Sequence, residues 1–322
     1  MKAIRVEDYG GPGHMEWSPV PDPRPGPGEA LVTVLAAGVN YIDTYHRTGL
    51  YPVRLPFTPG LEGAGVVREL GEGTEGIEVG DRVAWSTCLG SYAEQVVGPA
   101  DRMVPVPPGV EIESAAGLLL QGITAHFLAN DTFPLSEGDR ALVHAGAGGV
   151  GLLLIQLAKR RGAEVFTTVG SAEKARLAES AGADHVICYR ETDFAEAVEE
   201  IAGPRPIDVV YDGVGAATFD RGLSVLRPRG MMVTFGNASG PVPPVAPLRL
   251  TQEGSLFLTR PTGADYVSTR AELLGRASSL FEMVISGELG LRIGHSLPMR
   301  EAARAHRMLE GRETTGKVIL IP

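Results

Sequence analysis

Three glycines between residues 144 and 151 have the spacing of a loop that binds a dinucleotide. Gly146, Gly148 and Gly151 form the pattern G-x-G-x-x-G directly after a short apolar segment and directly before a helical one. Glycines here permit a tight turn and the close approach of a pyrophosphate, whose charge is met by backbone N–H groups and the positive end of the helix dipole. Because a glycine-rich turn can also serve only to pack a helix on a sheet, the interpretation depends on the surrounding elements.

The end of the next predicted strand favours NADPH over NADH. Sites that prefer NAD usually carry an acidic residue about 20 residues past the glycines, where it holds the ribose 2′-hydroxyl. At this place the chain has Ser171, followed by Lys174 and Arg176. A 2′-phosphate would find a hydroxyl, an ammonium group and a helix N-terminus there. Ser171 is also a suitable helix N-cap, and the two roles are compatible.

Strands and helices alternate regularly around this loop, from residue 124 to residue 262. We predict strands at 140–145, 164–169, 185–189, 207–212 and 231–235, and helices at 150–161, 172–180, 194–201 and 218–226. Short connections with right-handed crossovers generate a parallel sheet covered on both faces. We therefore expect a doubly wound dinucleotide-binding domain, with a last edge strand running from Ser255 to Thr259.

The remaining residues, 1–123 and 263–322, are expected to form a second domain. Short β segments, separated by Gly and Pro, are predicted at 2–7, 30–39, 65–70, 82–85, 92–97 and 103–106. Their alternation and β-branched content favour a mostly antiparallel, barrel-like domain. The tail, with helices at 271–286 and 300–310 and a strand at 317–321, is expected to return to this domain.

Composition excludes several classes of protein. The 322 residues are 43% hydrophobic and 21% charged, which is typical of a folded globular chain. The net charge is −10 and no region has a basic excess, so nucleic acid is an improbable partner. Glycines break the uncharged run at 141–158, and the first residues lack the apolar core of a signal peptide, so we expect a cytoplasmic protein without a membrane segment. Cys88 and Cys188 are too far apart in sequence to indicate a cysteine metal site.

Further motifs lie along nearly the whole chain. They are A-G-V-N-Y-I-D at 37–43, P-G-L-E-G-A-G at 59–65, G-D-R-V at 80–83, G-S-Y-A at 90–93, Y-D-G-V-G at 211–215, F-G-N at 235–237 and L-T-R-P at 258–261. With the glycine loop, these motifs resemble those of the zinc-independent quinone oxidoreductases of the medium-chain dehydrogenase/reductase superfamily, the group that includes ζ-crystallin. The resemblance implies an α/β fold, in which a GroES-like β-rich catalytic domain accompanies a Rossmann domain.

The resemblance also bears on metal binding. The zinc-containing relatives, the alcohol dehydrogenases, place a cysteine ligand after the third long strand and a histidine ligand in a G-H-E motif. In this chain Val39 and Asn40 stand at the first place and Leu61 at the second, before Glu62. Leucine offers no lone pair to zinc, and the four-cysteine structural lobe is missing. We therefore expect no metal site, and hydride transfer that needs no metal.

The site residues follow from the same resemblance. Asn40, Tyr45 and Tyr51 would line the nicotinamide end of a cleft, with Asn40 or a tyrosine donating a hydrogen bond to the acceptor oxygen; the tyrosines could equally be packing residues. Asp43, in the same segment, is a further candidate for cofactor contact, and helix capping is a better interpretation of it than acid–base work. The other implied cofactor contacts are Thr124, Phe127, Gly146, Gly148, Gly149, Val150, Gly151, Gly170, Ser171, Lys174, Tyr189, Val214, Gly236, Asn237, Ser239, Pro261 and Lys317.

The resemblance implies an NADPH-dependent quinone oxidoreductase with its substrate between the two domains. We expect a homodimer joined through the edge strand near Ser255 to Thr259. One alternative is an NADPH-dependent reductase of α,β-unsaturated ketones or aldehydes. An alternative of another class is an NADPH-binding protein with a structural or RNA-associated role.

Overall fold

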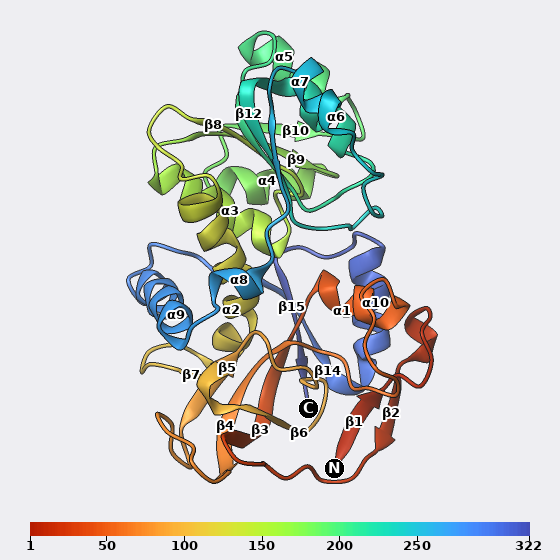
Figure 1. The fold of residues 1–322 in the computed structure, drawn as a ribbon, viewed down its shortest axis with the longest axis vertical. Coiled ribbons are helices and arrows are strands. Elements are labelled where there is room, and N and C mark those ends of the chain that lie inside the picture. The colour runs from red at the N-terminus through yellow and green to blue at the C-terminus, as the bar shows by residue number, and fades with distance from the viewer. The chain divides into compact units, whose positions relative to one another are not determined.

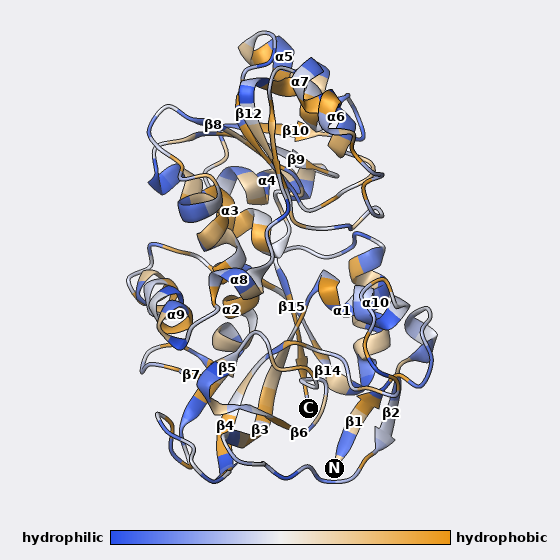
Figure 2. Ribbon diagram, viewed as in Figure 1, coloured by the Kyte–Doolittle hydropathy of each residue, from blue (hydrophilic) through white to orange (hydrophobic).

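The computed structural model describes residues 1–322 and divides into two compact units. Unit 1 comprises Met1–Ile123 and Val267–Pro322, and unit 2 comprises Thr124–Tyr266 (Figure 1). The second boundary therefore lies four residues beyond the one expected from the sequence. Hydrophobic residues gather on the strands of each unit and on the helix that follows the glycine loop (Figure 2).

Unit 2 is built on a six-stranded parallel sheet with the order β10-β9-β8-β11-β12-β13. Its strands are β8 (Arg140–Val143), β9 (Glu164–Val169), β10 (His185–Cys188), β11 (Ile207–Asp212), β12 (Leu226–Thr234) and β13 (Phe257–Thr259). Counted within the unit, the order is 3-2-1-4-5-6, which is the order of a dinucleotide-binding doubly wound sheet. The predicted fold class is therefore confirmed, and β13 is an edge strand as expected.

Helices connect these strands. They are η3 (Leu128–Thr132), α3 (Gly149–Arg160), α4 (Ala172–Ser180), α5 (Phe194–Ala202), α6 (Phe219–Val225), α7 (Pro247–Gln252) and α8 (Gly263–Tyr266). The sequence does not predict α7 or α8, which are short and follow proline-rich or irregular segments. Val198 of α5 and Leu223 of α6 pack with Phe166 and Val210 of the sheet in one fully buried cluster. Burial of these side chains fixes the helices on the sheet.

Unit 1 contains a seven-stranded sheet and a two-stranded ribbon. The ribbon pairs β1 (Lys2–Arg5) with β2 (Glu16–Pro19). The sheet has the order β14-β15-β3-β4-β5-β7, with β6 also paired to β3. Its strands are β3 (Glu29–Val39), β4 (Glu62–Leu70), β5 (Arg82–Trp85), β6 (Gln95–Pro99), β7 (Val104–Pro105), β14 (Ile293–Pro298) and β15 (Lys317–Ile321). All pairs are antiparallel except β14–β15, and β15 of the tail pairs with β3.

Two of the α-helices that begin in unit 1 are not predicted from the sequence. The helical elements are η1 (Pro12–His14), α1 (Tyr41–Thr48), η2 (Ala100–Arg102), α2 (Ile112–Phe127), α9 (Arg270–Ile285), η4 (Met299–Glu301) and α10 (Ala302–Glu310). The two unpredicted α-helices are α1, which has only eight residues, and α2, which is apolar on nearly every side and so shows no helical period. By length and composition alone, Ile112–Thr132 could cross a membrane, but two thirds of that window is buried in the structure, as in the core helix of a globular protein.

Candidate active site

The glycine loop connects β8 to α3 with a strained backbone. Ala145 has a φ of 57°, and the N–H of Gly148 donates to its carbonyl at 2.9 Å. Helix α3 begins at Gly149, and its N-cap residue Gly148 offers no side chain to the first turn. The amide end of the helix therefore has no capping group, which is the arrangement that accepts an anion.

Close contacts explain two of the glycines. A Cβ atom at Gly151 would lie 2.4 Å from the carbonyl oxygen of Ala145. A Cβ atom at Gly146 would lie 2.0 Å from Oγ1 of Thr167, a hydroxyl that donates to Val143 at 2.6 Å. With Thr167 in place, the loop can therefore fold this tightly only with glycine at both positions.

The residues predicted to bind the 2′-phosphate meet at the ends of β9 and β10. Ser171 is the N-cap of α4, and its hydroxyl accepts the N–H of Lys174 at 3.3 Å. Tyr189 follows β10, and a Cβ atom at Gly170 would lie 2.6 Å from its hydroxyl oxygen. The corner thus combines a hydroxyl, a lysine and the first turn of a helix, and its N-cap is serine rather than a carboxylate.

The loops after β11 and β12 are bound to each other. The N–H and the hydroxyl of Ser239 both donate to the carbonyl of Val214, at 2.7 and 2.8 Å. A Cβ at Gly236 would lie 2.4 Å from the carbonyl oxygen of Gly213. The structure therefore brings Val214, Gly236, Asn237 and Ser239 together at the carboxyl edge of the sheet, where such folds bind ligands.

A cation at this edge was not among the predicted residues. The exposed Arg260, next to the predicted Pro261, donates through Nη1 to Oγ1 of Thr234 at 3.0 Å. Its place in L-T-R-P is the only sequence signal that could have indicated it.

Phe127 and Thr124 lie on α2. Phe127 is 1% exposed, and its ring is stacked on Tyr266 with centroids 4.1 Å apart. Thr124 is partly exposed. The ring of Phe127 is therefore covered by its neighbour, whereas Thr124 offers accessible surface.

Two predicted catalytic tyrosines are neighbours in unit 1. Tyr45 lies on α1 and Tyr51 in the following loop, with ring centroids 5.2 Å apart in an edge-on arrangement. The N–H of Tyr51 donates to the carbonyl of Tyr45 at 3.1 Å, which ties the loop to the helix. Tyr45 is 8% exposed and Tyr51 is more accessible.

Asn40 and Lys317 lie together but are sealed from solvent. Lys317 has no accessible surface, and its Nζ donates to Oδ1 of Asn40 at 2.8 Å and to Oε2 of Glu62. The amide Nδ2 of Asn40 donates to the same oxygen of Glu62 at 2.9 Å. Lys317 is completely buried and Asn40 is 4% exposed, and their predicted contacts with the ligands stay a prediction.

Asp43 is the first member of a buried chain of hydrogen bonds. Its Oδ2 accepts the N–H of Asn40 at 2.9 Å, which caps α1, and the hydroxyl of Tyr92 at 2.8 Å. Tyr92 in turn lies 3.3 Å from Nε2 of His306, whose Nδ1 lies 3.1 Å from Arg47. Since Arg47 can only donate, the neutral ring carries its proton on Nε2, and every bond then runs toward Asp43.

Burial shifts the pKa values along this chain. It raises the pKa of Asp43 to about 6, although the hydrogen bonds from Asn40 and Tyr92 lower it. It lowers the pKa of His306 to about 3, with a further contribution from the charge of Arg47. Asp43 is fully buried and bonds the start of α1 and Tyr92, and its predicted contact with the cofactor stays a prediction.

The donors of a zinc site are not assembled in this protein. No group of three or more His, Cys, Asp or Glu residues is placed to hold a metal ion. Glu62 uses both oxygens internally, since Oε1 accepts the N–H of Leu120 at 2.8 Å and Oε2 is bound by Lys317 and Asn40.

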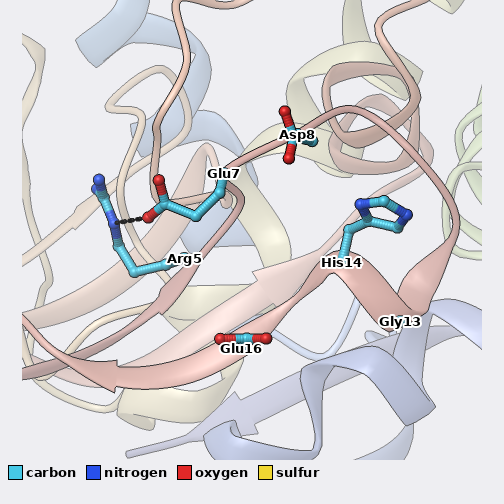
Figure 3. A pocket seen from close by; sticks show the side chains of 6 residues that line it. All are labelled: Arg5, Glu7, Asp8, Gly13, His14 and Glu16. Carbon is cyan, nitrogen blue, oxygen red and sulfur yellow. Dashed lines mark ion pairs between the residues drawn. The ribbon is translucent and has the colours of Figure 1, made fainter.

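A shallow pocket of about 200 Å³ lies beside the β1–β2 ribbon (Figure 3). Its lining residues are Arg5, Glu7, Asp8, Gly13, His14 and Glu16. Arg5 and Glu7 form an ion pair at 3.6 Å. None of the predicted site residues contributes to this pocket.

Comparison with known proteins identifies a family for two regions of the chain. Residues 26–108 match the alcohol dehydrogenase GroES-like domain, and residues 149–273 match the zinc-binding dehydrogenase family. The chain is 43% identical to a quinone oxidoreductase of Pseudomonas aeruginosa, over 100% of this chain and 99% of that protein. It is 41% identical to a 2-haloacrylate reductase of Burkholderia, over 99% and 98%. The Escherichia coli quinone oxidoreductase complexed with NADPH superposes with a TM-score of 0.98 at 40% identity, over 100% of both chains.

Proposed function

Because the chain belongs to the quinone oxidoreductases of the medium-chain dehydrogenase/reductase superfamily, we propose that it reduces a quinone at the expense of NADPH. Bound NADPH supplies a hydride from its nicotinamide ring, and the protein supplies binding, orientation and hydrogen bonds. The observation that carries the proposal is the glycine loop at the first turn of a 3-2-1-4-5-6 sheet, with Ser171 and Lys174 at the next strand end.

The residues of unit 2 fit the cofactor. The uncapped amide end of α3 and the close-packed glycines suit a pyrophosphate. Ser171, Lys174 and Tyr189 suit a 2′-phosphate, because an ammonium and hydroxyls can donate to its oxygens. The loops that carry Val214 and Ser239 are hydrogen-bonded to each other and offer backbone groups to the rest of the cofactor.

We propose that the tyrosines donate a hydrogen bond to the oxygen of the quinone. The negative charge that develops on a quinone oxygen is stabilised by a preorganised hydroxyl donor. Tyr51 is the more accessible of the pair, and its contact with Tyr45 restrains its ring. Asn40, whose amide is held by Glu62 and Lys317, then orients the start of α1 rather than the substrate.

Three further features belong to the proposal. The reaction proceeds without a metal, so treatment with a chelator leaves activity unchanged and metal analysis finds no stoichiometric zinc. A second copy of the chain pairs along β13, where Phe257 is 56% exposed. The cytoplasmic location expected from the sequence stays a prediction.

The similarity to a 2-haloacrylate reductase supports a second candidate, the reduction of an activated carbon–carbon double bond. Steady-state rates with 1,4-quinones, enones and 2-haloacrylates, each with NADPH and with NADH, separate the two. We expect the highest kcat/KM with a quinone and NADPH. A large preference for enones or haloacrylates would assign the chain to the second candidate. NADPH binding without turnover of any acceptor would instead indicate a structural role.

A further inference from the structure

Lys317 occupies a slot that only two glycines leave open. The chain has four lysines among its 29 basic residues, and Lys317 is the one without accessible surface. A Cβ at Gly38 would lie 2.7 Å from Cε of Lys317, and a Cβ at Gly117 would lie 2.9 Å from its Cγ. Strand β3 and helix α2 therefore each lack a side chain where the lysine passes, so the space is shaped for an extended lysine.

The ammonium at the end of this slot closes a triangle. It donates to Oδ1 of Asn40 and to Oε2 of Glu62, and the amide of Asn40 donates to the same oxygen. The second oxygen of Glu62 accepts the N–H of Leu120. Four segments that are distant in sequence, namely β15, the end of β3, β4 and α2, are thus joined through one buried ion pair.

Stability alone is a weak explanation for this arrangement. Transfer of two charges out of water carries a desolvation penalty, and apolar side chains of similar volume often replace such a pair without loss of stability. What the triangle provides is a defined position for Asn40. The backbone N–H of Asn40 donates to Asp43 at the start of α1, and α1 carries Tyr45, which contacts Tyr51.

We propose that Lys317 is a positioning residue that, through Asn40 and Glu62, holds the first turn of α1 and thereby places the tyrosine pair. In this role Lys317 does not contact the substrate and acts through Asn40 and Glu62. The catalytic consequence rests on the proposed function, whereas the structural consequence, the order of α1, does not.

The test is a variant that removes the pair without leaving a lone buried charge. In Lys317→Met/Glu62→Leu, apolar side chains replace both ions, so no lone charge is left in the interior. The side chain of Asn40 and the N–H of Leu120 each lose a partner, so we expect the variant to fold with a lowered urea midpoint. Hydrogen exchange of the α1 amides should become faster by about tenfold or more, while exchange in unit 2 stays unchanged. The kcat for quinone should fall by about tenfold, with the NADPH Kd within about twofold of wild type.

The matched control is Lys159→Met/Asp184→Leu, which removes a partly exposed pair at 2.7 Å in unit 2. It should leave exchange in α1 at the wild-type rate. The proposal is overturned if the α1 amides of Lys317→Met/Glu62→Leu exchange at the wild-type rate. It is also overturned if that variant does not fold, because the ion pair would then be needed for stability. Faster exchange in α1 without any quinone turnover in the wild type would uphold the positioning role and reject the proposed function.

Discussion

At the scale of single residues, two buried polar clusters meet at Asn40. Its side chain belongs to the triangle with Lys317 and Glu62, and its backbone N–H belongs to the chain that runs through Asp43 to Tyr92. Both clusters contain groups that burial makes costly to ionise unless they are hydrogen-bonded. The start of α1 is therefore tied to both clusters through one residue.

Asp43 makes the stability of the protein depend on pH in a definite direction. The pKa of Asp43 in the folded state is about 6, above the ordinary value of 3.8. Its contribution to the stability of the folded state is therefore complete below pH 4 and is lost as the pH rises through 6. Relative to Asp43→Asn, which keeps an acceptor oxygen, the wild type should lose up to about 3 kcal/mol of its free energy of unfolding across this pH range.

Urea unfolding of both proteins at pH 4, 5, 6 and 7 measures this difference. His306 acts in the opposite direction, because its lowered pKa favours the folded state as the pH rises from about 3 towards 6.5. It is present in both proteins, and so its contribution cancels in the comparison. A difference between the two proteins that does not change with pH would show that Asp43 ionises in the folded state as readily as in the unfolded one.

Lys174 should discriminate between the two nicotinamide cofactors. Lys174→Ala removes one charge-assisted hydrogen bond to a 2′-phosphate, so NADPH binding should weaken by about 1.5–3 kcal/mol. NADH lacks that phosphate, and its Kd should scarcely change. Isothermal titration calorimetry with both cofactors tests this, with Lys159→Ala as a control for the loss of one charge. An equal loss for NADPH and NADH would remove Lys174 from the phosphate site.

At the scale of elements, the connection from β8 to α3 depends on a contact with β9. Gly146→Ala would push a methyl group to 2.0 Å from Oγ1 of Thr167, so the variant should be less stable and bind NADPH more weakly. Overpacking of this kind costs about 1–3 kcal/mol. The double variant Gly146→Ala/Thr167→Ala removes the clashing hydroxyl and should recover most of the loss. Thermal unfolding and cofactor titration measure both effects, and no recovery in the double variant would locate the strain elsewhere.

At the scale of the whole molecule, the proposed dimer pairs along β13, one of the two edge strands of the unit 2 sheet. Phe257 on β13 is 56% exposed, and Leu248 on the preceding helix α7 is 65% exposed. A charge on an edge strand opposes pairing with another strand. Phe257→Lys should therefore shift the protein from dimer to monomer in analytical ultracentrifugation, while Ile285→Lys, which charges an exposed position of α9 in unit 1, should not. A wild-type protein that sediments as a monomer would contradict the proposed assembly.

The elements of unit 2 could be predicted from the sequence because their signals are local. Strand β9, helix α4 and strand β11 begin and end at the predicted residues, since apolar runs, helical periodicity and caps such as Ser171 are properties of neighbouring residues. The glycine loop could likewise be predicted from the spacing of its glycines. Helix α2 was not, because a helix buried on nearly every side has no polar face to mark its period.

The sequence by itself determined the alternation of strands and helices, the glycine loop, and the serine and lysine that follow the second strand of unit 2. Only the tertiary structure decided that Lys317 and Asn40 are sealed from solvent. The partners of the Lys317 ammonium lie 277 and 255 residues away in the chain, at Asn40 and Glu62. Whether a charged side chain faces a ligand or an internal partner is set by which strands pair and what they bury, and no local pattern carries that information.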